Sequence, residues 1–354
     1  MEGMLFSIWL TNNCNLKCSY CYIGEKNGEE MKDETKEKIV DFISLKSEIE
    51  KRKKSERKHI NIVYFGGEPL LRFDLITFFT KEIKKKIKGI PIFFHMTTNG
   101  TLLTKEIINY FKENQLPVTL SVDGIPEVHD YYRKFKNGKG SWATIEKRVG
   151  TLLKELPDSY ARLTFTSQTV PYLRKSVRFL VDLGFKNIKP IPDFFDPQWT
   201  EENFKILEEQ SFQILEDYLN KYNNKGIEIT FLKHKYEIKN YGICDGGVNQ
   251  FYILPNGDIY PCNYVAKRKK FCLGNVSEPM NLKTPLYLNA EPVRELCQGC
   301  VYFNFCESKR CTYLNYAMTG KMDKPNGFFC AYEKLIFKIA NVLKRRESDE
   351  YTFK

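Results

Sequence analysis

The cysteines are the feature that most restricts what this chain can be. There are eleven in 354 residues, and they form two groups. Three lie near the N-terminus at Cys14, Cys18 and Cys21, and no other occurs before Cys244. The second group is Cys244, Cys262, Cys272, Cys297, Cys300, Cys306, Cys311 and Cys330. Because ordinary core thiols would be scattered, this grouping predicts two domains, each with its own use for cysteine.

The N-terminal segment indicates the compartment in which these thiols are held. It lacks the cationic and apolar regions of a secretory signal, and no apolar stretch approaches the roughly 20 residues needed to cross a bilayer. We therefore expect a soluble cytoplasmic protein with no membrane partner. Disulfides are rare in that compartment and an odd cysteine count does not suit a closed framework, so metal binding or catalysis is favoured.

Between the two cysteine groups, β-rich runs alternate with amphipathic helical patterns. We expect strands at 5–10, 60–65, 92–96, 118–122, 163–166 and 188–191. We expect helices at 36–45, 75–87, 107–111, 142–156, 173–183 and 200–222. Strands that alternate with helices form right-handed β-α-β units and a parallel sheet. The predicted fold class is therefore α/β, with the sheet either open or closed into a barrel.

Polar clusters follow the predicted strands, at the sheet edge where such folds place ligands. The first cluster leads into Cys14-x3-Cys18-x2-Cys21, with no fourth Cys or His nearby. A structural zinc site needs four ligands, whereas an iron–sulfur cluster held by three thiolates keeps one iron open. The motif therefore predicts a cluster at which chemistry can occur.

Four motifs in order resemble those of the radical S-adenosylmethionine (radical SAM) enzymes over residues 4–195. They are Cys-Asn-Leu-Lys-Cys-Ser-Tyr-Cys, Gly66-Gly67-Glu68-Pro69, Thr98-Asn99-Gly100 and Ser121-Val122-Asp123-Gly124. The resemblance implies a partial (β/α)6 TIM-like barrel with a 4Fe-4S cluster on Cys14, Cys18 and Cys21. It also implies that S-adenosylmethionine binds the open iron and yields a 5′-deoxyadenosyl radical that removes a substrate hydrogen.

The same resemblance implies which residues contact S-adenosylmethionine. They are Tyr20, Gly66, Gly67, Glu68, Thr98, Asn99, Ser121 and Arg133. Gly66, Gly67 and Glu68 would receive the methionine amine, since bare glycine backbone permits close approach and a carboxylate accepts from an ammonium. For Arg133, a solvated surface position is an equally good interpretation.

The C-terminal cysteines resemble the SPASM extension of radical SAM enzymes, a small domain with two auxiliary clusters. Its elements include Gly257-x4-Cys262 and Cys297-x2-Cys300-x5-Cys306-x4-Cys311, whose last gap is one residue longer than usual. The resemblance implies three 4Fe-4S clusters in all. One auxiliary cluster would be held by Cys297, Cys300, Cys306 and Cys330, and the other by Cys244, Cys262 and Cys311. Cys272 either completes the latter or leaves it an open iron, and a zinc ribbon over 297–311 is the structural alternative.

The pattern divides the chain into four parts. We expect a radical SAM core at 1–195, a helical bridge at 196–240, a SPASM domain at 241–335 and a basic C-terminal tail at 336–354. The net charge is +11, but the basic stretches at 51–58, 84–88 and 267–270 belong to no nucleic-acid motif. Solvated faces are therefore favoured over a leader-peptide site, and no nucleic-acid partner is expected. None of the four histidines pairs with another at metal spacing.

The resemblance implies a peptide or protein substrate and an electron donor such as flavodoxin or ferredoxin. Two reactions compete: crosslinking of ribosomally made, Cys-containing peptides through thioether or other bonds, and oxidation of Cys or Ser to formylglycine by anaerobic sulfatase-maturing enzymes. Gly138-x-Gly140-Ser141-Trp142 suits the second type. That type has an aspartate base after the second SPASM cysteine, where this chain has Asn263, an amide that cannot accept a proton at neutral pH.

We therefore expect a crosslinking peptide maturase and assign no catalytic base, because Asp245 and Asp258 are not at the motif position. Formylglycine formation is the alternative. An iron–sulfur binding or scaffold protein without activity is the non-enzymatic alternative.

Overall fold

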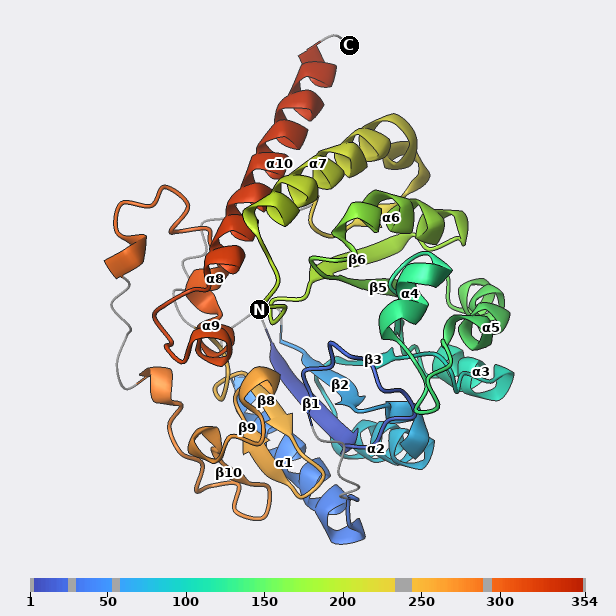
Figure 1. Cartoon of the computed structure of the whole chain (residues 1–354). Helices are drawn as coiled ribbons and strands as arrows, with labels where there is room; N and C mark the ends of the chain where they lie inside the picture. The colour runs from blue at the N-terminus through green and yellow to red at the C-terminus, as the bar shows by residue number, and fades with distance from the viewer. Residues whose placement is uncertain (1–2, 25–29, 53–57, 233–243, 289–294, 353–354) are drawn as a thin grey trace. The chain divides into compact units, whose positions relative to one another are not determined.

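The computed structural model describes five stretches of the chain (Figure 1). They are residues 3–24, 30–52, 58–232, 244–288 and 295–352. The chain divides into two compact units. The first contains Met1–Lys17, Cys21–Thr119 and Asp245–Glu291, and the second contains Cys18–Tyr20, Leu120–Cys244 and Pro292–Lys354.

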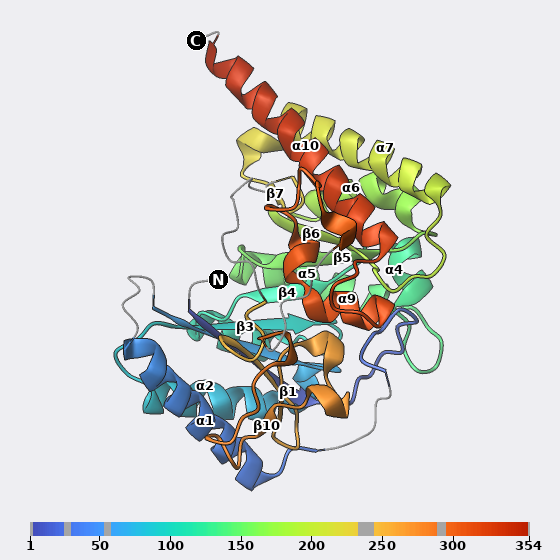
Figure 2. The same cartoon turned by 90° about the vertical axis from the view of Figure 1, so that its left-hand side faces the viewer.

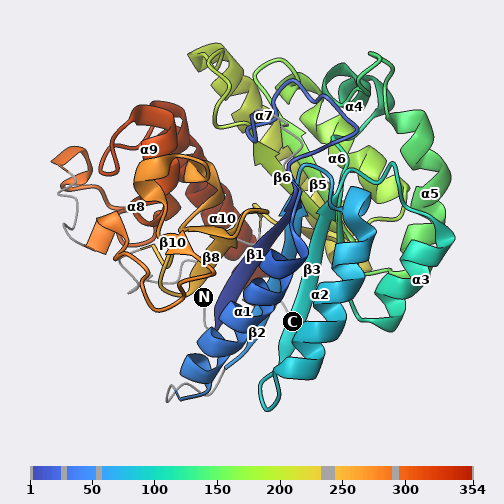
Figure 3. The same cartoon turned by 90° about the horizontal axis from the view of Figure 1, so that it is seen from below.

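The first unit is built on three parallel strands, β1 (Met4–Thr11), β2 (Ile60–Gly66) and β3 (Ile92–Thr98). The helices of this part are α1 (Asp33–Arg52), α2 (Phe73–Lys86) and α3 (Lys105–Glu113). Helices α1 and α2 pack side by side along these strands (Figure 3). Phe42 of α1 meets Phe6 of β1 edge-on at 6.0 Å, and both rings are fully buried. The core of the first unit therefore lies between the sheet and this helix pair.

A C-terminal segment extends the same sheet. Strand β8 (Gln250–Ile253) pairs in parallel with β1, and β9 (Asp258–Tyr260) pairs antiparallel with β8 and with β10 (Gly274–Asn275). The strand order in the first unit is therefore β10-β9-β8-β1-β2-β3. The sequence analysis did not predict these strands, because runs of two to four residues carry too little alternation to be recognised.

The second unit continues the alternation of strands and helices. Strand β4 (Val118–Ser121) spans the boundary of the units, and β5 (Tyr160–Phe165), β6 (Asn187–Pro192) and β7 (Glu228–Ile229) pair in parallel. Helices α4 (Pro126–Tyr132) and α5 (Trp142–Glu155) lie between β4 and β5 in the chain, and α6 (Leu173–Asp182) lies between β5 and β6. Backbone N–H of Val122 donates to the Arg162 carbonyl at 3.0 Å, which links the end of β4 to β5.

Two long helices lie along each other in the second unit (Figure 2). Helix α7 (Glu201–Asp217) begins at a capping box of Thr200 and Asn203, and α10 (Gly327–Thr352) packs against it. The short helices α8 (Glu307–Arg310) and α9 (Thr312–Thr319) precede α10. Asp217, at the end of α7, accepts hydrogen bonds from Arg174 and Arg178 of α6 at 2.6–3.0 Å. These hydrogen bonds hold the C-terminal end of α7 against α6.

The predicted strands and helices are all present, and Thr104 caps α3 as expected by accepting from the Ile107 N–H at 3.3 Å. The fold class is α/β with a parallel sheet. Helix α4 was not predicted, and α10 runs without a break through residue 335, where the sequence analysis places a domain border. The three borders between the four predicted parts stay predictions. In the part of the chain that the structure describes, no helix has the length and apolar character to span a bilayer.

Candidate active site

The turn after β2 holds the loop that carries the first cysteine. Backbone N–H groups of Gly67 and Glu68 donate to the carbonyls of Thr11 and Asn13, each at 2.9 Å. A Cβ on Gly66 would lie 2.3 Å from the Thr11 oxygen, and one on Gly67 would lie 2.1 Å from the Asn13 oxygen. The two glycines are therefore required by the approach of the cysteine loop itself.

The Glu68 carboxylate ties this turn to the end of β3. Its side chain is buried, and Oε1 accepts from the Leu70 N–H at 3.0 Å and from the Thr98 hydroxyl at 2.7 Å. Oε2 accepts from the backbone N–H of Asn99 at 2.7 Å. Three donors hold the carboxylate in one orientation and favour its charged form.

Asn99 connects this network to a predicted cluster ligand. Its Nδ2 donates to Cys14 Sγ at 3.8 Å and to Asn15 Oδ1 at 2.9 Å, while Leu16 N–H donates to the same sulfur at 3.4 Å. Cys14 is only 7% exposed. N–H groups directed at a buried sulfur stabilise its thiolate, the form that binds iron.

A second network lies in the second unit and centres on Asp123. Asp123 Oδ2 accepts from the Tyr20 hydroxyl at 2.5 Å and from Arg133 Nε at 2.8 Å, and Oδ1 accepts from the Thr164 N–H at 2.9 Å. Asp123 is fully buried and the Arg133 side chain is 8% exposed. The guanidinium also lies 5.3 Å from the centre of the Tyr20 ring. Tyr20, which stands between two predicted cluster ligands, is therefore fixed by a buried ion pair.

The surroundings of Arg133 and Tyr20 determine the protonation states of these two side chains. Burial acts to lower the pKa of Arg133, but the Asp123 carboxylate outweighs it, so the pKa rises above its ordinary value. Burial also raises the pKa of the Tyr20 phenol; Arg133 opposes that rise and Asp123 adds to it. Arg133 stays a cation and Tyr20 a neutral hydrogen-bond donor at neutral pH.

His129 supports the same network from α4. Its Nδ1 accepts from the backbone N–H of Asp123 at 3.3 Å, so the ring proton is on Nε2, which lies 2.9 Å from Ser141 Oγ. Burial, opposed by Asp123 and reinforced by Arg133, lowers the pKa of His129 to about 3. The imidazole is therefore neutral and acts as a structural link.

The predicted site residues thus fall into two groups. Cys14, Glu68, Thr98 and Asn99 form one hydrogen-bonded network with the glycine turn, and Tyr20 and Arg133 form another. Ser121 is buried at the end of β4. Arg133 is not a surface residue, which corrects the alternative interpretation given above. The sequence analysis quoted Asp123 within a motif but assigned it no role; an acid directly after a strand was the signal that could have found it.

In the first unit, the C-terminal thiols Cys262 and Cys272 have polar surroundings. Cys272 Sγ donates to the Gly274 carbonyl at 3.5 Å, and the Cys262 thiol donates to Asn263 Oδ1 at 3.5 Å. The pKa of Tyr260 is raised by burial first, and then by Cys272, with which its hydroxyl forms a hydrogen bond. Asn263 Nδ2 in turn donates to the Tyr22 hydroxyl at 3.0 Å.

In the second unit, Cys306 and Cys330 share one environment. Burial, followed by the Glu333 carboxylate, raises the pKa of the Cys306 thiol to about 11, with a smaller contribution from Cys330 and with backbone N–H groups opposing. Glu333 itself accepts from the Glu307 N–H at 2.7 Å. A positive iron centre would offset this electrostatic cost, because a coordinated thiol binds as thiolate.

The donor chemistry fits iron–sulfur clusters. All eleven cysteines lie in the described residues and are present as thiols. Within those residues, no three His, Cys, Asp or Glu side chains converge closely enough to hold a single metal ion. A cluster binds each thiolate through a different iron, so its cysteines stand farther apart than the ligands of one ion. Thiolate ligands with N–H donors to sulfur, as at Cys14, suit such clusters.

The class of protein follows from these features together with sequence comparison. The chain matches the radical SAM superfamily over residues 8–180 and the SPASM iron–sulfur cluster-binding domain over residues 244–301. It is 31% identical to an uncharacterized protein of Methanocaldococcus jannaschii over 80% of this chain and 93% of that protein. The chain therefore belongs to the radical SAM superfamily and carries a SPASM domain, which confirms the resemblance. It is a radical SAM enzyme, with S-adenosylmethionine and iron–sulfur clusters as cofactors.

Relatives of known activity and solved structures indicate which radical SAM enzymes this chain is similar to. The cysteine-type anaerobic sulfatase-maturating enzyme of Clostridium perfringens is 26% identical over 85% of this chain and 87% of that enzyme. The structure of native anSMEcpe with bound AdoMet and Cp18Cys peptide matches with a TM-score of 0.78 at 22% identity, covering 98% of this chain and 100% of that chain.

Streptococcus suis SuiB bound to precursor peptide SuiA matches with a TM-score of 0.66 at 15% identity, covering 93% of this chain and 76% of that chain. At these identities the structures show the fold. It is the α/β fold with a parallel sheet typical of the radical SAM partial barrel, followed by a C-terminal SPASM region, and the predicted fold class is confirmed.

Proposed function

We propose that this enzyme removes a hydrogen atom from a ribosomally made, Cys-containing peptide and closes a thioether or other crosslink. The observation that carries the proposal is Asn263, which directly follows Cys262 where the formylglycine-forming type has a carboxylate base. Relatives with bound peptides in their structures support a peptide substrate. An electron donor of the flavodoxin or ferredoxin kind is part of the same proposal.

The contacts of Asn263 support the interpretation that this residue does not act as a base. Its Nδ2 donates to the Tyr22 hydroxyl at 3.0 Å. A carboxamide held in this way offers no group that takes a proton at neutral pH. Oxidation of a substrate thiol to an aldehyde therefore lacks its proton acceptor at this position, whereas in crosslinking the thiol proton is released to solvent before the thiolate captures the substrate radical.

We propose that the cofactors are S-adenosylmethionine and three 4Fe-4S clusters, held by the cysteine sets that the resemblance implies. Bound S-adenosylmethionine and its cluster supply a 5′-deoxyadenosyl radical that takes the substrate hydrogen. Cys14, fixed by Asn99, would be a ligand, and Glu68 would receive the methionine amine. Arg133, held by Asp123, would face the carboxylate.

The crosslinking reaction balances with these parts. One C–H and one S–H bond of the peptide are lost and one C–S bond forms. The hydrogen atom goes to the 5′-deoxyadenosyl group, the thiol proton to solvent, and the remaining electron to an auxiliary iron–sulfur cluster. The substrate thus undergoes a two-electron oxidation.

Formylglycine formation is the second candidate. The similarity to the Clostridium perfringens enzyme spans 85% of this chain, which favours a shared reaction. In that case a group other than Asn263 would have to accept the proton.

Mass spectrometry of a treated peptide distinguishes the two reactions. The holoenzyme is incubated anaerobically with S-adenosylmethionine, dithionite and a Cys-containing peptide encoded beside its gene; a sulfatase-derived Cys peptide is run in parallel. We expect loss of two hydrogen atoms and protection of the cysteine from alkylation in the first peptide. The triple variant Cys14→Ala, Cys18→Ala, Cys21→Ala is the control and should leave both peptides unchanged. Replacement of the cysteine sulfur by oxygen would establish the second candidate instead.

A further inference from the structure

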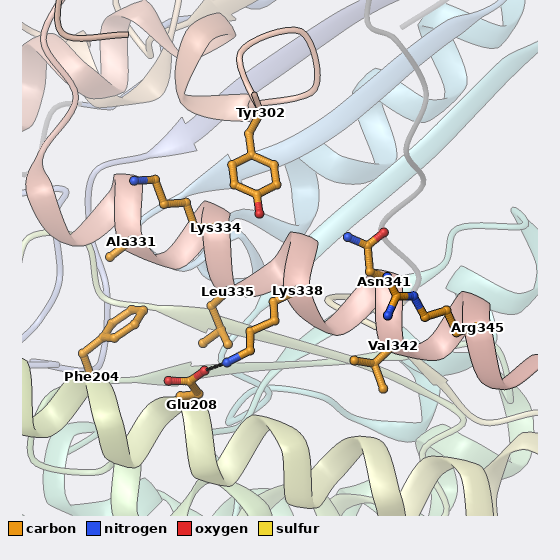
Figure 4. Close-up of a pocket in the computed structure, with 10 residues that line it drawn as sticks. All are labelled: Phe204, Glu208, Tyr302, Ala331, Lys334, Leu335, Lys338, Asn341, Val342 and Arg345. Carbon is orange, nitrogen blue, oxygen red and sulfur yellow. Dashed lines mark hydrogen bonds and ion pairs between the residues drawn. The ribbon is translucent and has the colours of Figure 1, made fainter. Parts of the chain in front are cut away.

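A groove of about 470 Å³ runs along α10 in the second unit (Figure 4). Phe204 and Glu208 of α7 form one side, and Tyr302 lies on the other. Between them α10 presents Lys334, Lys338 and Arg345. This surface is called the α10 groove below.

The α10 groove is cationic. Lys334, Lys338 and Arg345 are spaced by four and seven residues, so they share one face of the helix. Glu208 is the one carboxylate among the described residues that line the groove, and it pairs with Lys338. The groove lining therefore carries three cationic side chains and one carboxylate. Buried Leu335, at 3% exposure, contributes apolar surface beneath them. The groove therefore complements an anionic surface.

The same helix carries a cysteine expected to bind an auxiliary cluster. Cys330 precedes Lys334 by four residues, or about 6 Å along the helix axis. On the other side of the groove, Tyr302 follows Cys300 by two residues, and its ring stacks on Phe337 of α10 with centres 5.0 Å apart. Two of the four thiols expected to hold one auxiliary cluster thus adjoin the groove. A charged surface beside a redox centre fits the small, polar interfaces of electron-transfer proteins.

We propose that the α10 groove docks an acidic one-electron carrier protein, with a flavin or iron–sulfur centre, which exchanges electrons with the cluster of Cys297, Cys300, Cys306 and Cys330. The proposal rests on the proposed function, since it requires that cluster. In the exchange, the reduced carrier loses one electron and the oxidised cluster gains one. No covalent bond forms or breaks, and no proton is transferred.

Binding measurements test the docking surface directly. Holoenzyme is titrated with oxidised flavodoxin by calorimetry at low ionic strength. The variant Lys334→Glu with Arg345→Glu should bind roughly tenfold more weakly, and added salt should weaken the native complex further. Glu and Lys have similar helix propensities, so α10 should persist. The control, Lys147→Glu with Lys154→Glu on exposed positions of α5, changes the net charge equally and should bind like the native enzyme.

A third variant changes affinity in the opposite direction. Glu208→Gln removes the carboxylate that pairs with Lys338 and should strengthen carrier binding several-fold. Because the two changes have opposite expected signs, a general loss of folding cannot imitate the result. Equal affinity of all variants for flavodoxin would overturn the proposal.

Kinetics separate this proposal from the proposed function. Cleavage of S-adenosylmethionine is driven either by dithionite or by reduced flavodoxin. We expect dithionite-driven rates to be equal in all variants, and the KM for flavodoxin to rise roughly tenfold only in the groove variant. A raised KM for the peptide with unchanged flavodoxin affinity would assign the groove to an acidic substrate segment and refute carrier docking. If native enzyme fails to cleave with dithionite, the proposed function fails, while the calorimetric result still decides the docking.

Discussion

The buried carboxylate of Asp123 has three partners at the end of β4: the phenol of Tyr20, the guanidinium of Arg133 and a backbone N–H of β5. A side chain with these partners couples the cysteine loop to α4. Asp123 and Arg133 are ten residues apart, and α4 lies between them. The sequence therefore showed both residues without indicating that they pair.

Replacing Asp123 by Asn should be strongly destabilising. The variant leaves the buried Arg133 cation without its carboxylate, which costs about 3 kcal/mol or more. Chemical denaturation should show this loss, and S-adenosylmethionine should bind the variant more weakly in equilibrium dialysis. The exposed Asp158→Asn variant is a matched control and should change stability by less than about 0.5 kcal/mol. Native stability of the Asp123 variant would contradict the buried ion pair.

His129 should make stability depend on pH below neutrality. Its pKa is about 3 in the folded protein, against an ordinary value of 6.5, so the unfolded chain binds a proton that the folded chain does not. Its contribution is fully present above pH 6.5 and decreases as the pH falls toward 3. Between pH 7.5 and 5.5 this one group should lower the free energy of unfolding by about 1.4 kcal/mol.

The contribution of His129 to the free energy of unfolding is measured by urea denaturation at both pH values. The native protein and the His129→Gln variant are compared. The variant lacks the titrating group, so the difference between the two proteins should shrink by that amount at the lower pH. A difference that does not change with pH would show that folding does not lower the pKa of His129.

Among the structural elements, the glycine turn after β2 is the one that fixes the cysteine loop. A methyl group on Gly67 would lie 2.1 Å from the Asn13 carbonyl, which is backbone and cannot move aside alone. Gly67→Ala should therefore cost about 3 kcal/mol and displace Cys14. Iron analysis after anaerobic reconstitution should show about four fewer irons per chain than in the native enzyme.

Gly150→Ala is the matched control, because no atom lies within 4 Å of the added methyl group. Gly150 is within α5, where alanine is favoured by about 0.5–1 kcal/mol. This variant should keep its iron and gain stability. Equal iron in both variants would mean that the loop does not depend on the turn.

At the same scale, the extent to which the sequence predicted the fold depends on the length of each element. Strands β1 to β6 and the helices near them other than α4 were predictable because four to eight residues of alternation, or several helical turns, carry a recognisable period. Strands β8 to β10 were not, since their pairing is long-range and their runs are short. The cysteine loop and Glu68 were recognised by their motifs. Their hydrogen-bond partners were not, because these lie at the ends of other strands that are distant in sequence and come together only in the fold.

For the whole molecule, iron content is the broadest test of the cluster assignment. Native enzyme reconstituted anaerobically should contain about twelve irons if three four-iron clusters are present. The triple variant Cys14→Ala, Cys18→Ala, Cys21→Ala should contain about eight and should not cleave S-adenosylmethionine. Iron and sulfide assays with detection of 5′-deoxyadenosine measure both quantities. Cleavage retained by the triple variant would refute the assignment of these thiols.

The pairing of β8 with β1 has a consequence for the order in which the protein is made. Strand β1 leaves the ribosome well before its neighbour β8, which begins only at Gln250. During synthesis, β1 therefore exposes an unpaired backbone edge, the type of surface on which chains associate wrongly. Since β1 leads directly into the cysteine loop, a nascent chain that has not reached β8 presents reactive thiols at the end of an unfinished sheet. The first cysteines are therefore protected only after the C-terminal segment that contains β8 has been synthesised and has paired with β1.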